Sequence, residues 1–373
     1  MPKKEIGVGL IGAGYMGKLH SVAMQSVASV FNTSLRPVCE MICTTSEAGA
    51  VESANALGFK QSTSDWRKLV ANPAVDAIVI ASPQSTHLEI ATAAMELGKP
   101  VMCEKPLGAS LDESRKLCEL AESRGVVNMV GFNYVRTPAT QYVRQLVSSG
   151  VLGRLCWFRG EHTEDFLHDP QAKANWRTRG ISNGTMGDLA PHMINAALAI
   201  MGPIRSLCAD VETVYEERPG DDGMEKVSND DQAQFTCRFE SGEMGHLYFS
   251  RVATGRKMGY AYEITGSKGA VRFDQEDQNA VWLYLAEGDE ATRGFRKILT
   301  NTEHPDYINF CLGPGHGTGY QDQIMIEARD FLVAIERGEP MWPTFRDGML
   351  VNQVVAAAHQ SSQSRSWVDV ASV

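Results

Sequence analysis

Lys105, Asp188 and His192 are the residues whose types and settings best suit acid–base chemistry on a small molecule. Lys105 stands in the stretch VMCEKPLG, where a strand-like run ends in Glu104 and Lys105 just before Pro106. A proline fixes its own φ and biases the preceding residue toward an extended conformation. We therefore expect Lys105 to be held at the end of a strand, aimed at a ligand.

The stretch GTMGDLAPHMIN places Asp188 and His192 four residues apart. On a helix this spacing puts both side chains on one face, one turn apart. A histidine exchanges protons near neutral pH, and a nearby carboxylate can fix its orientation. The alternative is a helix with a capping aspartate and a buried histidine.

A glycine-rich segment near the N-terminus predicts a dinucleotide site. The apolar run Ile6–Ile11 predicts a buried strand, and GAGYMG follows it with Gly12, Gly14 and Gly17 at G-x-G-x-x-G spacing before a helical pattern. In this motif the first glycine permits a tight turn, the second lets the pyrophosphate approach the backbone, and the third lets the helix pack closely. The N–H groups at the start of the helix then face the phosphates.

Strand and helix patterns alternate through the first third of the chain. Apolar strands are predicted at 36–42, 75–82, 100–105 and 126–133, and helices at 46–58, 87–98 and 110–125. Repeated βα units with apolar strands predict the α/β class, with a parallel, doubly wound Rossmann sheet. Ligands bind at the carboxyl ends of such strands. Lys105 and the segment Ala81–His87 are expected at that edge.

After Asn133 the pattern changes. Several strands alternate apolar and polar residues, ESGE and GSKG predict hairpin turns, and helical patterns return near 321–337 and 347–363. We predict a dinucleotide-binding domain over residues 1–132 and a substrate-binding and oligomerisation domain over residues 133–373. The second domain is expected to be α+β around a large, mostly antiparallel open sheet. A homodimer or homotetramer through that sheet is expected.

Composition narrows the range of partners. The chain has 373 residues, of which 43% are hydrophobic and 21% charged, with a formal net charge of −10. This length predicts two domains, and the negative charge disfavours nucleic acid and anionic membranes. No stretch approaches the length that spans a bilayer. A small-molecule partner is therefore expected.

The cysteines and the N-terminus predict a cytoplasmic protein without a metal site. No C-x-x-C pair or His cluster completes a zinc pattern among the eight cysteines, so buried, reduced thiols are expected. The N-terminal stretch MPKKEIGVGLIGAGYMG imitates a signal peptide, but Glu5 breaks its positive region and glycines interrupt its apolar run.

The choice between NAD and NADP is left open by the sequence. An acidic residue usually follows the second strand in NAD-binding chains, but here Ile42 is followed by a cysteine and the hydroxyl run Thr44, Thr45 and Ser46. Glu40 lies within the strand, where it is expected to face a neighbouring element. The hydroxyls tolerate a 2′-phosphate, so we predict use of both cofactors.

The motifs GLIGAGYMGKLH, CEKP and GDLAPHMIN, in this order, resemble the glucose–fructose oxidoreductase, inositol dehydrogenase and rhizopine-catabolism family. The stretches STSDWRKL, GFNYVRTPA, NWRTRG and GPGHGTGY are similar to a branch with inositol, levoglucosan and L-glucose dehydrogenases. The resemblance implies an NAD(P)-dependent oxidoreductase that transfers a hydride between a secondary alcohol of a cyclic polyol or pyranose sugar and nicotinamide.

The resemblance also implies residue roles. Lys105 touches the reacting hydroxyl and the nicotinamide ribose, Asp188 and His192 bind the sugar and exchange the proton, and Pro106 is often cis. We expect substrate contacts from Lys105, Arg177, Asp188, His192, His316 and Tyr320. We expect cofactor contacts from Gly12, Gly14, Tyr15, Met16, Gly17, Thr44, Ser82, Pro83, His87, Glu104, Lys105, Asn133, Trp176 and Arg177.

Other interpretations remain open at this point. NWRTRG is also typical of a solvated loop, and GPGHGTGY of a mobile one. A dinucleotide-binding sensor without catalysis, or a glycosidase using tightly held NAD as a transient oxidant, could share the fold. A zinc-dependent alcohol dehydrogenase is disfavoured, because the chain lacks the required Cys and His spacing.

Overall fold

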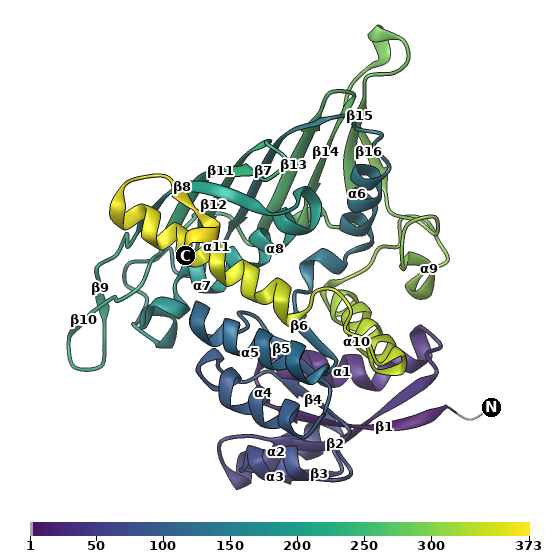
Figure 1. Ribbon diagram of the computed structural model, residues 1–373, viewed down its shortest axis with the longest axis vertical. Coiled ribbons are helices and arrows are strands. Elements are labelled where there is room, and N and C mark those ends of the chain that lie inside the picture. The colour runs from purple at the N-terminus through teal and green to yellow at the C-terminus, as the bar shows by residue number, and fades with distance from the viewer. Residues whose placement is uncertain (1–2) are drawn as a thin grey trace. The chain divides into compact units, whose positions relative to one another are not determined.

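A computed structural model describes residues 3–373 of the chain. The chain divides into two compact units. The first contains the residues up to Arg136 together with Gly319–Asn352, and the second contains Thr137–Thr318 together with Gln353–Val373. Figure 1 labels the helices and strands of both units.

The first unit is built on a six-stranded parallel sheet with the order β3-β2-β1-β4-β5-β6. Its strands are β1 (Lys4–Ile11), β2 (Leu35–Cys43), β3 (Gln61–Thr63), β4 (Ala77–Ile80), β5 (Val101–Glu104) and β6 (Asn128–Gly131). Its helices are α1 (Tyr15–Val30), α2 (Glu47–Leu57), α3 (Trp66–Ala71), α4 (His87–Glu96), α5 (Leu111–Arg124) and α10 (Tyr320–Arg337), with 3-10 turns η1 (Gln84–Thr86) and η2 (Tyr134–Arg136). The predicted Rossmann sheet is confirmed.

Local signals explain where several of these helices start and stop. The Ser46 side chain accepts a hydrogen bond from Gly49 N at the start of α2, and Gly58 ends that helix in the left-handed conformation with φ 74°. Ser110 Oγ accepts from Glu113 N at the start of α5, which is half of a capping box. The other half is absent, because Glu113 Oε2 accepts from Ala109 N rather than from Ser110 N.

The second unit is built on a nine-stranded sheet with the order β16-β15-β14-β13-β7-β12-β11-β8-β17. All its strand pairs are antiparallel except β12 with β7. Its strands are β7 (Leu155–Thr163), β8 (Ile204–Glu212), β11 (Gln232–Phe239), β12 (Met244–Ser250), β13 (Gly259–Gly266), β14 (Gly269–Asp274), β15 (Ala280–Leu285), β16 (Arg296–Leu299) and β17 (Val368–Asp369). The predicted hairpins ESGE and GSKG join β11 to β12 and β13 to β14.

Short helices and a small hairpin complete the second unit. The hairpin consists of β9 (Glu217–Pro219) and β10 (Met224–Lys226). The helices are α6 (Pro138–Ser148), α7 (Thr185–Asp188), α8 (Ala190–Met201) and α9 (Tyr307–Phe310), with 3-10 turns η3 (Trp176–Thr178), η4 (Ile181–Asn183), η5 (Gln275–Asp277), η6 (Glu290–Thr292) and η7 (Val370–Ser372). α11 (Phe345–Ser364) runs from the first unit into the second.

One face of the large sheet is covered by helices. α8 contacts β7 and β12, and α6 contacts β14 and β15 (Figure 1). Along β11 the residues alternate between buried and exposed, because successive side chains point to opposite faces of a strand. The apolar members, such as Phe235 and Phe239, form the core beneath these helices.

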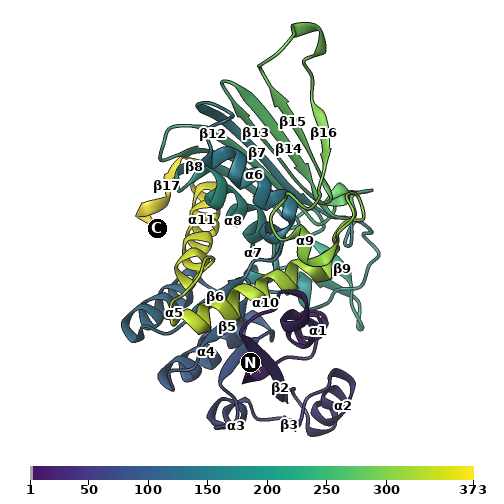
Figure 2. The ribbon, with the colours of Figure 1, turned by 90° about the vertical axis from the view of Figure 1, so that its right-hand side faces the viewer.

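The compact units differ from the predicted division at residue 132. The sequence pattern assigned everything after that point to the second domain, but Gly319–Asn352 groups with the first unit. The reason is α10, which packs along α1, as Figure 2 shows. Nothing in the local sequence of an amphipathic helix indicates which distant partner buries its apolar face.

All eight cysteines are free thiols, and five of them are buried. Among residues 3–373 no helix is both long and apolar enough to cross a membrane.

Candidate functional site

The glycine-rich loop between β1 and α1 has the geometry of a phosphate cradle. Gly12 has a φ of 101°, and a Cβ there would lie 2.4 Å from the carbonyl oxygen of Ala81. A Cβ on Gly17 would lie 2.1 Å from Gly12 O. Gly14 differs, because a Cβ there would meet nothing within 4 Å, and no side chain caps the start of α1. The loop thus leaves backbone amides and open space where a pyrophosphate can bind.

The end of β2 carries hydroxyls rather than a carboxylate. Thr44 Oγ1 donates to Ser46 O at 3.0 Å. Glu40 faces the neighbouring β3 region, as predicted, with Lys60 Nζ and Gln61 Nε2 each 2.9 Å from its carboxylate. Each carboxylate oxygen of Glu40 therefore already accepts a hydrogen bond from another side chain of the protein.

Lys105 follows the last residue of β5, so it lies at the carboxyl edge of the parallel sheet. The Lys105–Pro106 peptide bond is cis, as the resemblance implied. His87 is buried, and its two ring nitrogens each lie 3.0 Å from a carbonyl oxygen, Nδ1 from Pro106 and Nε2 from Ser82. It therefore ties the segment after β4 to the segment after β5. Burial lowers the pKa of His87.

Tyr15 and Met16, two of the predicted cofactor residues, lie beside Tyr320, a predicted substrate residue at the start of α10. The Tyr320 ring stacks with Tyr15 at a centroid distance of 6.2 Å and lies 5.7 Å from the Tyr134 ring. Tyr320 Oη is also near Met16 Sδ, at 3.9 Å. Burial raises the pKa of the Tyr320 phenol. Pro83 precedes η1, next to Ser82.

The second unit brings Arg177 and Asp188 together. Arg177 Nη1 lies 2.5 Å from Asp188 Oδ2. The guanidinium carbon lies 4.4 Å from the Trp176 ring centroid and 5.2 Å from that of Phe166. Both distances are within the range of cation–π contacts, which favour a guanidinium next to aromatic rings. Phe166 was not singled out by the sequence.

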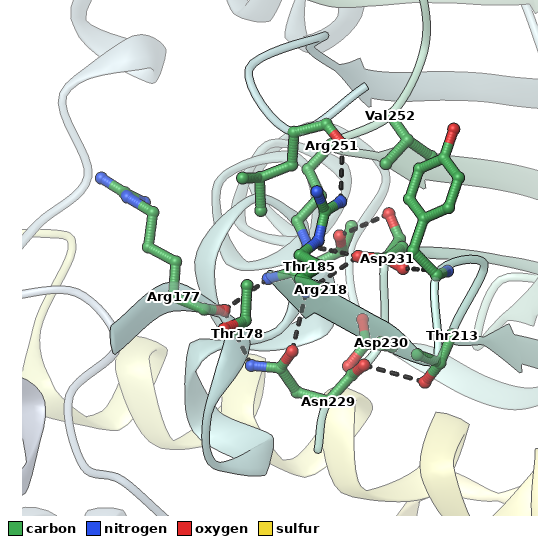
Figure 3. A network of polar contacts seen from close by, with 12 residues as sticks. Arg177, Thr178, Thr185, Thr213, Arg218, Asn229, Asp230, Asp231, Arg251 and Val252 are labelled. Atoms are coloured by element: carbon green, nitrogen blue, oxygen red, sulfur yellow. Dashed lines mark hydrogen bonds and ion pairs between the residues drawn. The ribbon is translucent and has the colours of Figure 1, made fainter. Parts of the chain in front are cut away.

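A buried polar network holds the main chain of Arg177 in place (Figure 3). Its carbonyl oxygen accepts hydrogen bonds from Asn229 Nδ2 at 2.9 Å and Arg251 Nη1 at 2.7 Å. Arg251 is in turn paired with Asp231 at 2.9 Å, and both side chains are almost fully buried. Asn229 Oδ1 accepts from Arg251 Nη2 at 2.7 Å, which closes the network.

The same region fixes the helix that ends in Asp188. Thr185 Oγ1 donates to the carbonyl oxygen of Asp231, and Asp230 Oδ2 accepts from Met186 N, both at 2.8 Å. Burial raises the pKa of Asp230, although the Met186 N–H bond acts in the opposite direction. The consecutive residues Asp230 and Asp231 thus anchor the first two residues of α7, through a side chain and a main-chain carbonyl respectively.

Asp188 and His192 do not share one helix as the sequence predicted. α7 ends at Asp188, and α8 begins at Ala190 after Leu189. The cause is Pro191, which has no N–H to continue the hydrogen bonding of α7. His192 lies in the first turn of α8 and is largely buried.

His162 is a neighbour of His192 that the sequence did not reveal. The two rings lie 5.6 Å apart between centroids. His162 Nδ1 lies 2.9 Å from the carbonyl oxygen of Leu189, and Nε2 lies 3.2 Å from Glu164 Oε1. His162 therefore braces the turn between Asp188 and His192 from β7. The only sequence signal is that His162 stands at the end of the strand-like run RLCWFRGEH.

His316 lies on an exposed loop whose backbone is anchored. A Cβ on Gly313 would lie 2.5 Å from the His316 ring, so the glycine makes room for the imidazole. Gly317, with a φ of 83°, donates to Tyr307 Oη at 3.1 Å. The second unit thus brings together Trp176, Arg177 and Asp188, and places His192 beside His162, with His316 on a separate segment. Among residues 3–373 no group of three or more His, Cys, Asp or Glu is placed to hold a metal ion.

A known family model matches part of each of the two units. Residues 6–132 match the model described as "Oxidoreductase family, NAD-binding Rossmann fold", and residues 140–272 match "GFO/IDH/MocA C-terminal domain". The chain is 34% identical over 384 residues to levoglucosan dehydrogenase of Pseudarthrobacter phenanthrenivorans, covering 98% of each chain. The chain belongs to the GFO/IDH/MocA family. It is an NAD-binding oxidoreductase with the predicted Rossmann fold.

One further relative and one solved structure are also similar to this chain. Inositol 2-dehydrogenase of Rhizobium meliloti is 28% identical over 370 residues, covering 97% of this chain and 98% of the relative. Among solved structures, levoglucosan dehydrogenase in complex with NADH and levoglucosan superposes with a TM-score of 0.96 at 35% identity, covering 98% of this chain and 100% of that one.

A pair of glycine substitutions tests the cradle. Gly12→Ala should lower the free energy of unfolding by about 2 kcal/mol or more, because alanine is strained at positive φ and its Cβ meets the Ala81 carbonyl. Gly14→Ala should leave unfolding within about 0.5 kcal/mol yet weaken NADH binding about tenfold or more, or about 1.4 kcal/mol. Urea unfolding and fluorescence titration measure the two effects. Unchanged NADH affinity in Gly14→Ala would place the pyrophosphate elsewhere.

Asn229→Ala tests the network beneath Arg177. The substitution removes one donor to Arg177 O and one acceptor from Arg251, and a buried group left unsatisfied costs about 1–3 kcal/mol. We expect KM for the non-nucleotide substrate to rise about tenfold while NADH affinity stays within about twofold. Thr213→Val is the matched control, because Thr213 bonds only to the carbonyl of Asn229 in this network. Equal effects of the two variants would contradict a role in positioning Arg177.

Proposed function

We propose that this enzyme oxidises a secondary alcohol of a cyclic sugar or polyol, of the size of levoglucosan or an inositol, to a ketone. The observation that carries the proposal is the Arg177–Asp188 ion pair, which lies four residues before His192 in the chain, with the intervening turn held by His162. Paired charged groups with aromatic neighbours suit a small ligand rich in hydroxyls. The relatives named for levoglucosan and inositol support this substrate class.

Each residue has a separate part in the proposal. His192 takes the hydroxyl proton as a base, and Asp188 binds a neighbouring hydroxyl while held by Arg177. Lys105 stabilises the developing negative charge on the alcohol oxygen. NAD⁺, when bound, supplies the acceptor for the hydride. His316 and Tyr320 are proposed to contact the substrate as well.

We further propose that the enzyme acts in the cytoplasm as a homodimer or homotetramer. The eight free thiols support a reducing compartment. On the large sheet, Met244 and Trp282 are exposed apolar residues, at 50% and 40%, which supports a role in association. Light scattering coupled to size-exclusion chromatography tests the assembly, and a monomeric mass would contradict it.

A substrate screen tests the activity itself. Levoglucosan, inositols, pyranose sugars and L-sorbose are each incubated with NAD⁺ or NADP⁺ while the absorbance of reduced cofactor is followed. Turnover with at least one cyclic polyol or sugar is expected. Failure with all of them, with NADH binding intact, would contradict the proposed substrate class.

Lys105→Met tests the role of the lysine after β5. Loss of the ammonium should lower turnover at saturating substrate by about a hundredfold or more, because a placed proton-handling group is worth about 10²–10⁴-fold. NADH affinity should change little. Lys116→Met, which removes an exposed lysine of α5, is the control and should behave like the unmodified enzyme. Near-normal turnover of Lys105→Met would remove Lys105 from the chemistry.

Thr44→Asp tests cofactor choice. With Glu40 committed to Lys60 and Gln61, no carboxylate ends β2 to repel a 2′-phosphate, so we expect appreciable use of both cofactors. Thr44→Asp should shift the ratio of kcat/KM values toward NAD, whereas Thr45→Asp, one residue further, should shift it less. A starting preference for NAD above about a thousandfold, or about 4 kcal/mol, would show that another residue selects the cofactor.

A further inference from the structure

Residues 313–316, with the sequence Gly-Pro-Gly-His, form a tight turn that ends in His316. The amide of His316 donates a hydrogen bond to Gly313 O at 3.3 Å, and Gly315 has a φ of 80°. A type II β-turn needs a positive φ at its third residue, which suits glycine, and it favours proline at its second. The sequence of this segment therefore suits the conformation that it adopts.

The hydroxyl of Tyr307 connects the two ends of this turn. Tyr307 is the first residue of α9, and its side chain is fully buried. Its Oη donates to Gly313 O at 2.8 Å and accepts from Gly317 N at 3.1 Å. A single hydroxyl thus pairs a carbonyl before His316 and an amide after it, although neither belongs to a helix or strand.

Two further side chains hold the segment that follows His316. Cys311 Sγ donates to Gly317 O at 3.2 Å. Asn279 Nδ2 donates to Thr318 O at 3.0 Å, and Asn279 Oδ1 accepts from Thr318 N at 2.6 Å. The glycine-rich stretch, whose composition is also typical of a mobile loop, is therefore anchored on both sides of His316.

The imidazole of His316 is exposed, but Gly313 gives it a defined place. A Cβ built on Gly313 would lie 2.5 Å from Cε1 and 2.8 Å from both Nδ1 and Nε2. Because three ring atoms lie at nearly the same distance, the ring lies across the glycine, and only a residue without a side chain leaves room for it there. The turn thus fixes both the main chain and the ring of His316.

We propose that Tyr307 is a positioning residue that acts through His316, with Gly313 as the platform on which the imidazole rests. A loop that is ordered before the substrate arrives does not have to be ordered on binding, so the substrate binds more tightly. The inference rests on the proposed contact between His316 and the substrate. The anchoring of the loop by the Tyr307 hydroxyl, in contrast, can be measured without any substrate.

Hydrogen exchange followed by mass spectrometry tests the anchoring on the full-length enzyme. Tyr307→Phe removes only the hydroxyl, so the amide of Gly317 loses its acceptor. Exchange in a peptide that covers residues 311–318 should become about threefold faster or more. Tyr262→Phe is the matched control, because it removes another buried hydroxyl of the same unit, which lies 3.0 Å from Thr140 Oγ1. Unchanged exchange in a folded Tyr307→Phe would overturn the proposal.

Steady-state kinetics tests the link to His316, with a sugar identified in the substrate screen. Tyr307→Phe and Gly313→Ala should each raise KM about fivefold or more, while kcat and the NADH dissociation constant stay within about twofold. Gly313→Ala displaces the ring without removing a hydrogen bond, and Gly313 does not have a positive φ, so this variant tests the proposal even where Tyr307→Phe does not fold. Gly294→Ala is its control, because a Cβ there meets nothing within 4 Å.

Combination with His316→Ala separates positioning from a general loss of structure. If Tyr307 and Gly313 act through the imidazole, adding either substitution to His316→Ala should change KM by less than about twofold. Additive effects would overturn the proposal, and so would a normal KM in both single variants when His316→Ala raises it. A normal KM in His316→Ala itself would contradict the proposed substrate contact and overturn the positioning role with it, whatever the exchange rates show.

Discussion

The guanidinium of Arg251 is the group around which the second unit's polar cluster is organised. Nε and Nη2 bind Asp231, Nη2 also binds Asn229, and Nη1 donates to the carbonyls of Arg177 and Asn183. A planar fork with five donors can hold several chain segments at fixed angles, which a lysine cannot. Removing either partner of such a buried pair costs about 3–5 kcal/mol. The positions of Arg177 and Asp188 depend on it, because the segment around η3 has little regular structure of its own.

The two units prepare their ligand-binding groups by different means. In the first, the parallel sheet and the glycine-rich loop present backbone amides, and the side chains behind them hold strand ends in place. In the second, Asn229, just before β11, and Arg251, just after β12, bind a carbonyl group of an irregular segment, the one that carries Arg177, which pairs with Asp188. Backbone groups away from regular structure need such partners when they are buried. Rigidity therefore comes from main-chain geometry in one unit and from side-chain hydrogen bonds in the other.

What the sequence could predict follows from how local each signal is. Gly12, Gly14 and Gly17 act within six residues, and a strand before and a helix after them were enough to locate the cradle. Lys105 was placed correctly at a strand end because a proline follows it. The i,i+4 spacing of Asp188 and His192 predicts one helix, but Pro191 between them has no N–H to continue it, so α7 ends before α8 begins. His20 Nε2 lies 2.7 Å from Glu104 Oε1 although the two residues are 84 apart in the chain, and no local pattern predicts such a contact.

The placement of α10 has a consequence for how the protein is made. Since α10 packs on α1 and its Asp330 pairs with the buried Arg136, the first unit lacks one of its walls until residue 337 has been synthesised. A nascent chain that ends near Arg136 already contains all six strands of the parallel sheet but leaves one side of α1 uncovered. The intervening Thr137–Thr318 is synthesised in that interval. The first unit, whose synthesis begins first, is therefore completed only after most of the second unit has been synthesised. An expression fragment that ends at Arg136 lacks α10, which packs on α1.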